Sequence, residues 1–311
     1  MSRRGANGPD GLVVVDKEAG WTSHDVVAKA RGLLGTRRVG HSGTLDPDAT
    51  GVLLLGVGRV TRLLKFLTAL PKTYTCEIVL GTETSTLDVS GEVIATHDMS
   101  SITIDRIEAA AAALTGEIMQ VPPMVSAVKV DGRRLHELAR EGIEVERQPR
   151  PVTVHRFVIA PTADPLVVRA EVDCSSGTYV RTLAADLGSA LGGGAHLREL
   201  RRTAIGSFGL DDALPLASVT PASILAPAVA MRDLPAVRVT ETERAEIGHG
   251  RVLQRDGRFA GPGPWALLAE DGALLAVYLD HRGGTVKPDV VIAPTSGAAP
   301  GPTSSPDPDR R

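Results

Sequence analysis

Cysteine is scarce in this sequence. The 311 residues include only Cys76 and Cys174, which lie far apart and belong to no CxxC motif or histidine cluster. This scarcity excludes a disulfide framework and a zinc site of the usual ligand spacing. We expect both residues to be reduced thiols inside the core.

Long apolar runs are also missing. No stretch approaches the roughly 18 to 20 apolar residues that a membrane-spanning helix needs. Met1 to Asp10 contains two arginines but no apolar segment behind them, so it does not resemble a secretion signal. We therefore expect no membrane association and a cytoplasmic location.

The composition that remains is typical of a globular protein, with 42% hydrophobic and 23% charged residues. The length favours one large domain with a smaller one. A formal net charge of −3 argues mildly against nucleic acid as a partner. The segment from Arg31 to Lys65 nevertheless holds six basic residues against two acidic ones, which would make one face basic. A solvated charged surface explains the same count, so charge alone does not identify the partner.

The order of the elements predicts an α+β fold. Strands and helices follow one another without the regular alternation of a doubly wound sheet, which favours a mixed, largely antiparallel sheet with flanking helices over residues 11–230. The expected strands are 12–15, 52–57, 74–80, 125–130, 152–160 and 166–174. The expected helices are 23–34, 105–114, 134–140 and 179–191. Between the first helix and the second strand, Thr36 to Gly51 is polar and rich in turn residues, as functional loops often are.

Residues 233–293 have a different pattern, with short strand-like runs between Gly-rich turns, and they predict a small C-terminal β-barrel. The runs are 236–239, 265–269, 274–279 and 290–293. The two ends, residues 1–10 and 294–311, are rich in small and polar residues, and we expect them to be disordered.

The segment from Gly40 to Gly51 is the most unusual in the chain, because it combines two carboxylates, a histidine and three glycines. One interpretation is structural: Asp46 caps a short helix or forms an Asx-turn before Pro47. A second takes Asp46-x-Asp48-x-Thr50 as the DxDxT signature of haloacid-dehalogenase phosphotransferases, which would require Mg²⁺. That family places the motif directly after a buried apolar strand, which the residues before Asp46 do not predict.

The same segment resembles the central motif G-H-[ST]-G-[AT]-L-D-P-x-A-T-G of the bacterial TruB-type pseudouridine synthases, which act on the T-loop of tRNA. The similarity continues co-linearly over roughly residues 10–230, and residues 233–293 resemble the PUA module that often follows this catalytic domain. The further matching segments are Asp16-Lys17 with Gly20, Lys72-x-Tyr74, Leu87-Asp88-x-x-Gly91, Val121-Pro122-Pro123-x-x-Ser126-Ala127-x-Lys129 and Cys174-Ser175-x-Gly177-Thr178-Tyr179-x-Arg181-Thr182. Two departures, Asp48 at a variable position and Thr73 where a basic residue is common, do not affect the motif's central aspartate.

The resemblance implies that the chain converts the uridine at position 55 of tRNA into pseudouridine. This isomerisation breaks the N1–C1′ glycosidic bond, turns the uracil and joins C5 to C1′, so no cofactor and no metal are expected. Asp46 is the implied nucleophile, because a carboxylate can trap or stabilise an electrophilic C1′. Attack at C6 and formation of a glycal both stay open. Arg181 would pair with Asp46 through a bidentate contact that keeps the carboxylate ionised and oriented.

The resemblance also implies which residues bind the RNA. Tyr74 would stack on the uracil where the C5 proton leaves, while Tyr179 and Leu200 would line the uracil pocket. His41 would fill the space left by the flipped base. From the sequence alone, each of these four would pass as a core or turn residue. The basic residues expected to contact phosphates are Arg31, Arg37, Arg38, Arg62, Lys129, Arg133, Arg134, Arg201 and Arg202.

The expected partner is therefore tRNA, bound through its T-stem-loop by a monomer that needs no other protein. A protein that binds or folds tRNA, with catalysis incidental, is a second hypothesis. The related guide-RNA-dependent synthases share the catalytic motif but work inside a multiprotein particle, and the sequence leaves such partners open.

Overall fold

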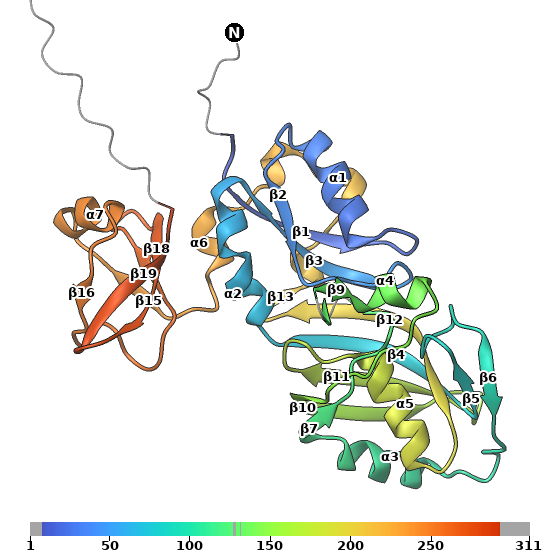
Figure 1. Ribbon diagram of the computed structural model, residues 1–311. Helices are drawn as coiled ribbons and strands as arrows, with labels where there is room; N and C mark the ends of the chain where they lie inside the picture. The colour runs from blue at the N-terminus through green and yellow to red at the C-terminus, as the bar shows by residue number, and fades with distance from the viewer. Residues whose placement is uncertain (1–7, 127–128, 131, 293–311) are drawn as a thin grey trace, which may run out of the picture.

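The computed structural model describes residues 8–126, 129–130 and 132–292. Its larger part is built on a ten-stranded mixed sheet with the order β14-β1-β3-β12-β4-β11-β10-β7, while β2 pairs with β3 and β13 pairs with β12 (Figure 1). The strands are β1 (Gly11–Lys17), β2 (Val39–Ser42), β3 (Thr50–Val57), β4 (Lys72–Leu80), β7 (Gly116–Gln120), β10 (Arg150–Pro161), β11 (Val167–Cys174), β12 (Ala195–Ile205), β13 (Phe208–Gly209) and β14 (Leu214–Pro215). Within this sheet only β1–β14 and β3–β12 pair in parallel, so the predicted α+β class with a largely antiparallel sheet is confirmed.

The helices cover the two halves of the sheet separately. In the β4–β11–β10 half, α3 and α5 pack on one face and bury a single apolar cluster with the strands. In the β1–β3 half, Val13 and Val15 face α1, whereas Leu12 and Val14 point to the opposite face. This alternation is what a strand buried on both faces requires. The helices are α1 (Ser23–Leu33), α2 (Leu64–Ala69), α3 (Ile104–Ala113), α4 (Leu135–Arg140), α5 (Val180–Ala190), α6 (Pro227–Ala230), α7 (Glu241–Gly248) and the 3₁₀ turns η1 (Gly58–Leu63), η2 (Leu210–Asp212), η3 (Leu216–Ser218) and η4 (Pro221–Ser223). Two short hairpins complete this part, β5 (Thr82–Thr84) with β6 (Val93–Thr96) and β8 (Lys129–Val130) with β9 (Arg133–Arg134).

A second sheet of five strands, drawn in orange and red in Figure 1, lies beyond α2 and α6 at one end of the molecule. It curls as a half barrel in the order β15-β17-β18-β19-β16, and within the described residues its end strands β15 and β16 do not pair with each other. The strands are β15 (Ala236–Arg238), β16 (Leu253–Gln254), β17 (Trp265–Leu268), β18 (Leu274–His281) and β19 (Thr285–Val291). Val277 and Ile292 share one apolar cluster with Leu12 of the large sheet, so the two sheets are joined by a common core.

Polar contacts reinforce this junction. Arg62 donates to the carbonyl of Val291 at 2.7 Å, and Arg59 donates both to the carbonyl of Ile292 and, at 2.6 Å, to the carboxylate of Asp10. The Arg59 guanidinium thus holds the carboxylate of Asp10, the last residue of the segment that we expected to be disordered. Residues 1–7 and 294–311 lie outside the described residues.

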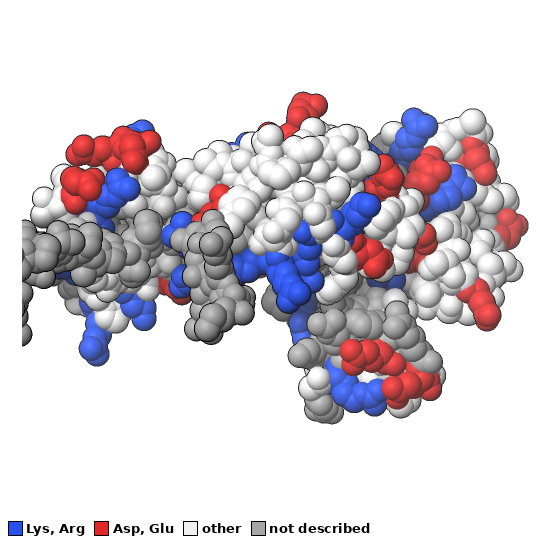
Figure 2. All heavy atoms as spheres, turned by 90° about the horizontal axis from the view of Figure 1, so that it is seen from above, with Lys and Arg blue, Asp and Glu red and all other residues white. Residues whose placement is uncertain are grey.

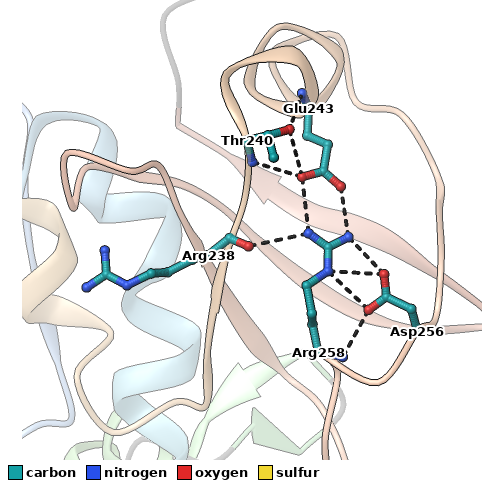
Figure 3. A network of polar contacts seen from close by, with 5 residues as sticks. All are labelled: Arg238, Thr240, Glu243, Asp256 and Arg258. Atoms are coloured by element: carbon teal, nitrogen blue, oxygen red, sulfur yellow. Dashed lines mark hydrogen bonds and ion pairs between the residues drawn. The ribbon is translucent and has the colours of Figure 1, made fainter.

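One polar network gives the small sheet its connection to α7 (Figure 3). Arg258 lies between two carboxylates and contacts Glu243 and Asp256, each at 2.8 Å. Glu243 also accepts from the backbone N–H of Thr240, which forms a capping box at the start of α7. The hydrogen bond from Arg258 lowers the pKa of Glu243 to about 2. Arg258 therefore serves the local fold and is not a free cation.

Some elements differ from those expected. Residues 125–130 do not form one strand, because Ser126 lies in a bend and β8 covers only 129–130; residues 127–128 lie outside the described part. The strand expected at 290–293 is the end of β19, and Ala293 is also outside the described part. The structure adds nine strands to those predicted, most of which are short; the additional strands are β2, β5, β6, β7, β9, β12, β13, β14 and β16. The strand β12 was not predicted because of its composition: four charged side chains in eleven residues do not indicate a central strand.

Both cysteines are buried free thiols, as expected. Burial raises the pKa of Cys76 to about 12 and that of Cys174 to about 11, so neither is a reactive thiolate at neutral pH. None of the helices in the described residues is long and apolar enough to cross a membrane.

The two halves of the large sheet meet at β3 and β12, which pair in parallel over only two positions. Gly51 of β3 lies here with φ +102°, and a Cβ at this position would lie 2.1 Å from the carbonyl oxygen of Arg202. Only glycine permits both the backbone conformation and the close approach of β12.

Replacing Gly51 with alanine should therefore destabilise the protein by about 2 to 5 kcal/mol, because it adds a left-handed alanine and a steric overlap. Urea unfolding followed by circular dichroism measures the loss. Gly209→Ala is the matched control: Gly209 has open space around it and a negative φ, so we expect a change within about 0.5 kcal/mol. Equal effects of the two substitutions would contradict this account of the junction.

Candidate active site

Asp46 lies in the loop of residues 43–49, which connects β2 to β3 and contains no helical turn. The interpretation of Asp46 as a helix cap is therefore wrong. The loop is held by the first residue of α1: the N–H of Leu45 donates to Ser23 Oγ at 2.9 Å, and Ser23 Oγ donates back to the carbonyl of Leu45 at 3.2 Å. The residue before Asp46 is thus fixed on both its backbone groups.

Lys17, at the end of β1, fixes the residue that follows Asp46. Its side chain is fully buried, and its Nζ donates to the carbonyls of Glu18, Trp21 and Pro47 at 3.0, 2.7 and 2.9 Å. The N–H of Gly20 donates to the same Pro47 carbonyl at 2.9 Å. Burial lowers the pKa of Lys17 to about 8, against the opposing effect of Asp46. The ammonium group thus supplies hydrogen-bond donors to backbone carbonyls that have no partner in a helix or strand.

Arg202 of β12 fixes the start of the loop. It is 1% exposed, and its guanidinium donates to the carbonyls of Val52, Gly43 and Thr44 at 2.8, 3.2 and 3.4 Å. The expectation that Arg202 contacts phosphate is therefore wrong, because the side chain is buried and its donors are directed to backbone carbonyls.

Arg181, in the first turn of α5, provides the cation beside Asp46. It is 5% exposed, and its Nε lies 3.1 Å from Asp46 Oδ2, so the expected ion pair is present. The contact is not the bidentate one that we expected, because Nη1 donates to the carbonyl of Thr86 at 3.0 Å and Nη2 to that of Val125 at 2.8 Å. The guanidinium therefore joins Asp46 to two other loops.

Asp88 is a second carboxylate on the same guanidinium, 3.4 Å from Arg181 Nη1. Its other oxygen accepts from Thr86 Oγ1 at 2.6 Å and from the N–H and hydroxyl of Ser90 at 3.0 and 2.5 Å. The sequence places Asp88 in a matching segment, but no local signal there indicates a contact with a residue 93 positions later. Asp88 is thus a site residue that sequence reasoning missed.

Asp46, Arg181 and Arg202 border a cavity of about 280 Å³ between the Asp46 loop, β4 and the start of α5. Tyr74, Tyr179 and Leu200 all line it, together with Asp46 and Arg181. The remaining lining residues are Gly43, Thr44, Leu45, Thr68, Lys72, Ser126, Ser175, Ser176, Gly177, Thr178, Val180 and Arg202. The volume lies near the lower end of small-molecule sites, roughly 300 to 1,000 Å³, which suits a single ring better than a nucleotide chain.

His41 is the expected site residue that does not line this cavity. It lies in β2, where its ring packs edge to face against His24 of α1 with the centroids 5.2 Å apart. Burial lowers the pKa of His41, and the neighbouring His24 and Arg202 lower it further. At neutral pH the ring is therefore uncharged and can fill space rather than transfer a proton.

The electrostatics of the cavity suit a carboxylate nucleophile. The Asp46 side chain keeps 42% of its surface exposed, so it can be reached. Burial raises its pKa, Arg181 opposes this, and Asp88 adds to it. Burial also raises the pKa of Tyr74, which keeps its ring neutral. A flat aromatic wall can hold a planar base, and the paired carboxylate beside it can attack an electrophilic carbon of the bound substrate. No group of three or more potential metal ligands occurs within residues 8–126, 129–130 and 132–292.

Comparisons with known proteins agree on one family. The model of the TruB family pseudouridylate synthase N-terminal domain matches residues 31–180, and that of the tRNA pseudouridylate synthase B C-terminal domain matches residues 181–236. The tRNA pseudouridine synthase B of Arthrobacter sp. (strain FB24) is 47% identical over 299 residues, covering 92% of this chain and 97% of that protein. The protein of the same name from Mycolicibacterium paratuberculosis is 48% identical over 299 residues, covering 93% and 99%. Among solved structures, a Cbf5-Nop10-Gar1 complex has a similar chain, with a TM-score of 0.71 and 25% identity over 92% of this chain and 85% of that one.

The contacts of Arg202 predict a large loss of stability when it is replaced by methionine. One buried carbonyl and two part-buried ones would lose their donor, at up to about 1 to 3 kcal/mol each, so we expect a loss of about 3 kcal/mol in urea unfolding. Arg198→Met, on the same strand, is the matched control. Arg198 is 40% exposed in its ion pair with Glu77, so its loss should cost less than about 1 kcal/mol. A similar loss in both variants would show that the contacts of Arg202 with these carbonyls are not what stabilises the loop.

Proposed function

Because the chain belongs to the TruB family of pseudouridylate synthases, we propose that it isomerises the uridine at position 55, in the T-loop of tRNA, to pseudouridine. The observation that carries this proposal is the accessible Asp46 carboxylate at a cavity of one-ring size, paired with the buried Arg181. The names of the relatives from Arthrobacter and Mycolicibacterium support tRNA as the substrate. The family also removes the reason to consider a phosphotransferase.

Asp46 is the nucleophile in this proposal. Its carboxylate attacks C1′ as the N1–C1′ bond breaks, the freed uracil turns, and the C5–C1′ bond forms as the carboxylate leaves. The C5 proton is lost and N1 gains one, so the product is an isomer and no redox cofactor is required. Routes through C6 or a glycal need the same ionised carboxylate at the same place. Arg181 keeps Asp46 ionised and oriented in all of them.

Three lining residues hold the base in this proposal. Tyr74 stacks on the uracil next to the point where the C5 proton leaves, while Tyr179 and Leu200 complete the walls. His41 stays outside the cavity with its uncharged ring, where it fills the space that the flipped base leaves in the RNA. Its role is in binding.

The remaining basic residues support an RNA-facing surface. Arg37, Arg38 and Arg62 are exposed, and Figure 2 shows basic side chains gathered near the middle of the molecule. Arg201 contributes less, because it pairs with Asp16 at 2.7 Å. The side chains of Lys129 and Arg134 lie outside the described part of the chain. Of the two other expected residues, both exposed, Arg31 belongs to this surface, whereas Arg133 contributes less because it pairs with Glu141. Such side chains position phosphates, while the shape of the folded RNA selects the loop.

The division into domains follows the same proposal. Residues 11–230 form the catalytic domain, and residues 233–293 form a PUA-like module that binds RNA beside it. The shared apolar cluster packs this module against the large sheet. The chain acts on tRNA as a cytoplasmic monomer without an obligatory protein partner.

Asp46→Asn tests the function. The substitution removes the nucleophile but keeps the size of the side chain, so we expect pseudouridine formation on a T-loop stem-loop to fall at least about 1,000-fold. Tritium release from C5-labelled uridine measures the rate, and fluorescence anisotropy of the labelled RNA measures binding, which should change less than about threefold.

Asp48→Asn is the matched control, because Asp48 is exposed on the same loop and should keep its activity. Undiminished turnover in Asp46→Asn would refute the proposed nucleophile. The alternative of a tRNA-folding protein is tested by refolding misfolded tRNA. If folding is a separate activity, the Asp46→Asn variant should refold the tRNA as efficiently as the native protein does.

The charges around Asp46 predict opposite pH shifts in two variants. The reaction needs ionised Asp46, so its rate should fall as the pH drops through the raised pKa of this carboxyl. Arg181→Met removes the cation that lowers this pKa and should move the acid limb to higher pH. Asp88→Asn removes an anion that raises it and should move the limb to lower pH. Single-turnover rates between about pH 4 and 8 measure the acid limb of each variant. Asp105→Asn, a substitution of an exposed residue on α3, is the control and should leave the limb unshifted. Shifts in the same direction would contradict this account.

A further inference from the structure

The central strand β12 contains an irregularity next to the cavity. Arg198 pairs with Glu77 of β4, and Arg201 pairs with Thr75, so β12 advances three residues while β4 advances two. One residue of β12 is therefore extra, and the strand forms a β-bulge. The bulge includes Glu199.

Glu199 has a left-handed backbone, with φ +55°. Among the described residues only one other non-glycine residue, Leu87, has a positive φ. The Glu199 side chain is exposed and takes part in no hydrogen bond or ion pair within the described residues. Its contribution to the fold therefore comes from its backbone conformation and not from a polar side-chain contact. Glycine would adopt this conformation at little cost, whereas glutamate adopts it under strain.

The bulge decides which side chains of β12 face the cavity. Successive residues of a regular strand point to opposite faces, so without the bulge Leu200 and Arg202 would share the face of Arg198. Arg198 lies on the face opposite α5, where it pairs with Glu77. With the extra residue, Leu200 instead packs against the α5 side and lines the cavity.

Arg202 changes face in the same way. Its pairing partner in β4 is Tyr74, whose ring lines the cavity, and its guanidinium reaches the carbonyls of the Asp46 loop. A regular β12 would direct this guanidinium away from the loop. The one-residue shift therefore supplies both a wall of the cavity and an anchor of the loop that carries Asp46.

We propose that Glu199 is a positioning residue for the reaction: its left-handed backbone shifts the register of β12 by one residue, which turns Leu200 into the cavity and Arg202 beneath the Asp46 loop. This inference rests on the proposed function only in assuming that the cavity binds the base during the reaction. The shift itself is a property of the fold. Strained residues that persist next to a reaction centre are common where strain sets the geometry.

The first experiment compares two substitutions by glycine. Glu199→Gly keeps the left-handed conformation without strain, so its Tm should stay level or rise, and it should form pseudouridine at the native rate. Thr75→Gly, in a regular position of the neighbouring strand, should lower Tm by about 2 to 4 °C. A fall in Tm as large in Glu199→Gly as in Thr75→Gly would overturn the proposed backbone role.

The second experiment replaces Glu199 with valine, which disfavours the left-handed conformation most strongly. We expect β12 to lose its bulge and the single-turnover rate on a T-loop stem-loop to fall at least about tenfold, with the Kd for the RNA changed less than about threefold. Thr75→Val is the matched control and should keep the native rate. A variant that lacks residue 199 should show a larger loss of rate than Glu199→Val.

The outcomes separate the possibilities. A lower Tm in Glu199→Val with a native rate at 25 °C would make the bulge merely structural and overturn the proposal. If the deletion variant does not fold, Glu199→Val still decides. If the native chain itself forms no pseudouridine, the proposed function fails, while the two glycine variants still test the strained backbone by their Tm.

Discussion

The buried guanidinium of Arg181 is the group on which the rest of the site depends. A cation that is 5% exposed must be surrounded by anions and carbonyls, since leaving it without partners costs several kcal/mol. Its partners come from three loops, which carry Asp46, Asp88 and Val125. Folding therefore cannot bury Arg181 without assembling these loops around it. The protein therefore cannot reach its folded state without forming the geometry of the site.

The Asp46 loop shows how charge replaces secondary structure. Its backbone forms neither helix nor strand, so its carbonyls need other donors. Lys17 supplies them after Asp46 and Arg202 before it. Arg181 and Lys17 also favour ionised Asp46, although burial and Asp88 act against this. The same contacts thus fix the position of the carboxylate and keep it charged in a partly dry cavity, where electrostatic effects are strong.

Local patterns in the sequence predict some of these elements and site residues but not the others. Apolar periodicity predicts β1, α1 and β3, because these elements bury side chains in a regular way. The twelve-residue motif singles out Asp46 and its loop. The strand β12 escapes prediction because its arginines are satisfied by tertiary partners that no local window contains, such as Glu77 for Arg198. Asp88 escapes for the same reason, since its contact with Arg181 joins distant parts of the chain. The expected bidentate contact failed because backbone carbonyls already occupy the other guanidinium nitrogens.

The position of the cavity follows from how the sheet is joined. Its two halves meet at β3 and β12 over only two paired positions, where Gly51 allows the backbones to touch. Next to this short junction the chain forms the Asp46 loop on one side and the Glu199 bulge on the other. A regular sheet would continue its ladder there and close the space that the base requires. The glycine, the bulge and the buried arginines are each costly or unusual locally, yet together they open the sheet at the one point where a carboxylate, a cation and an aromatic wall converge.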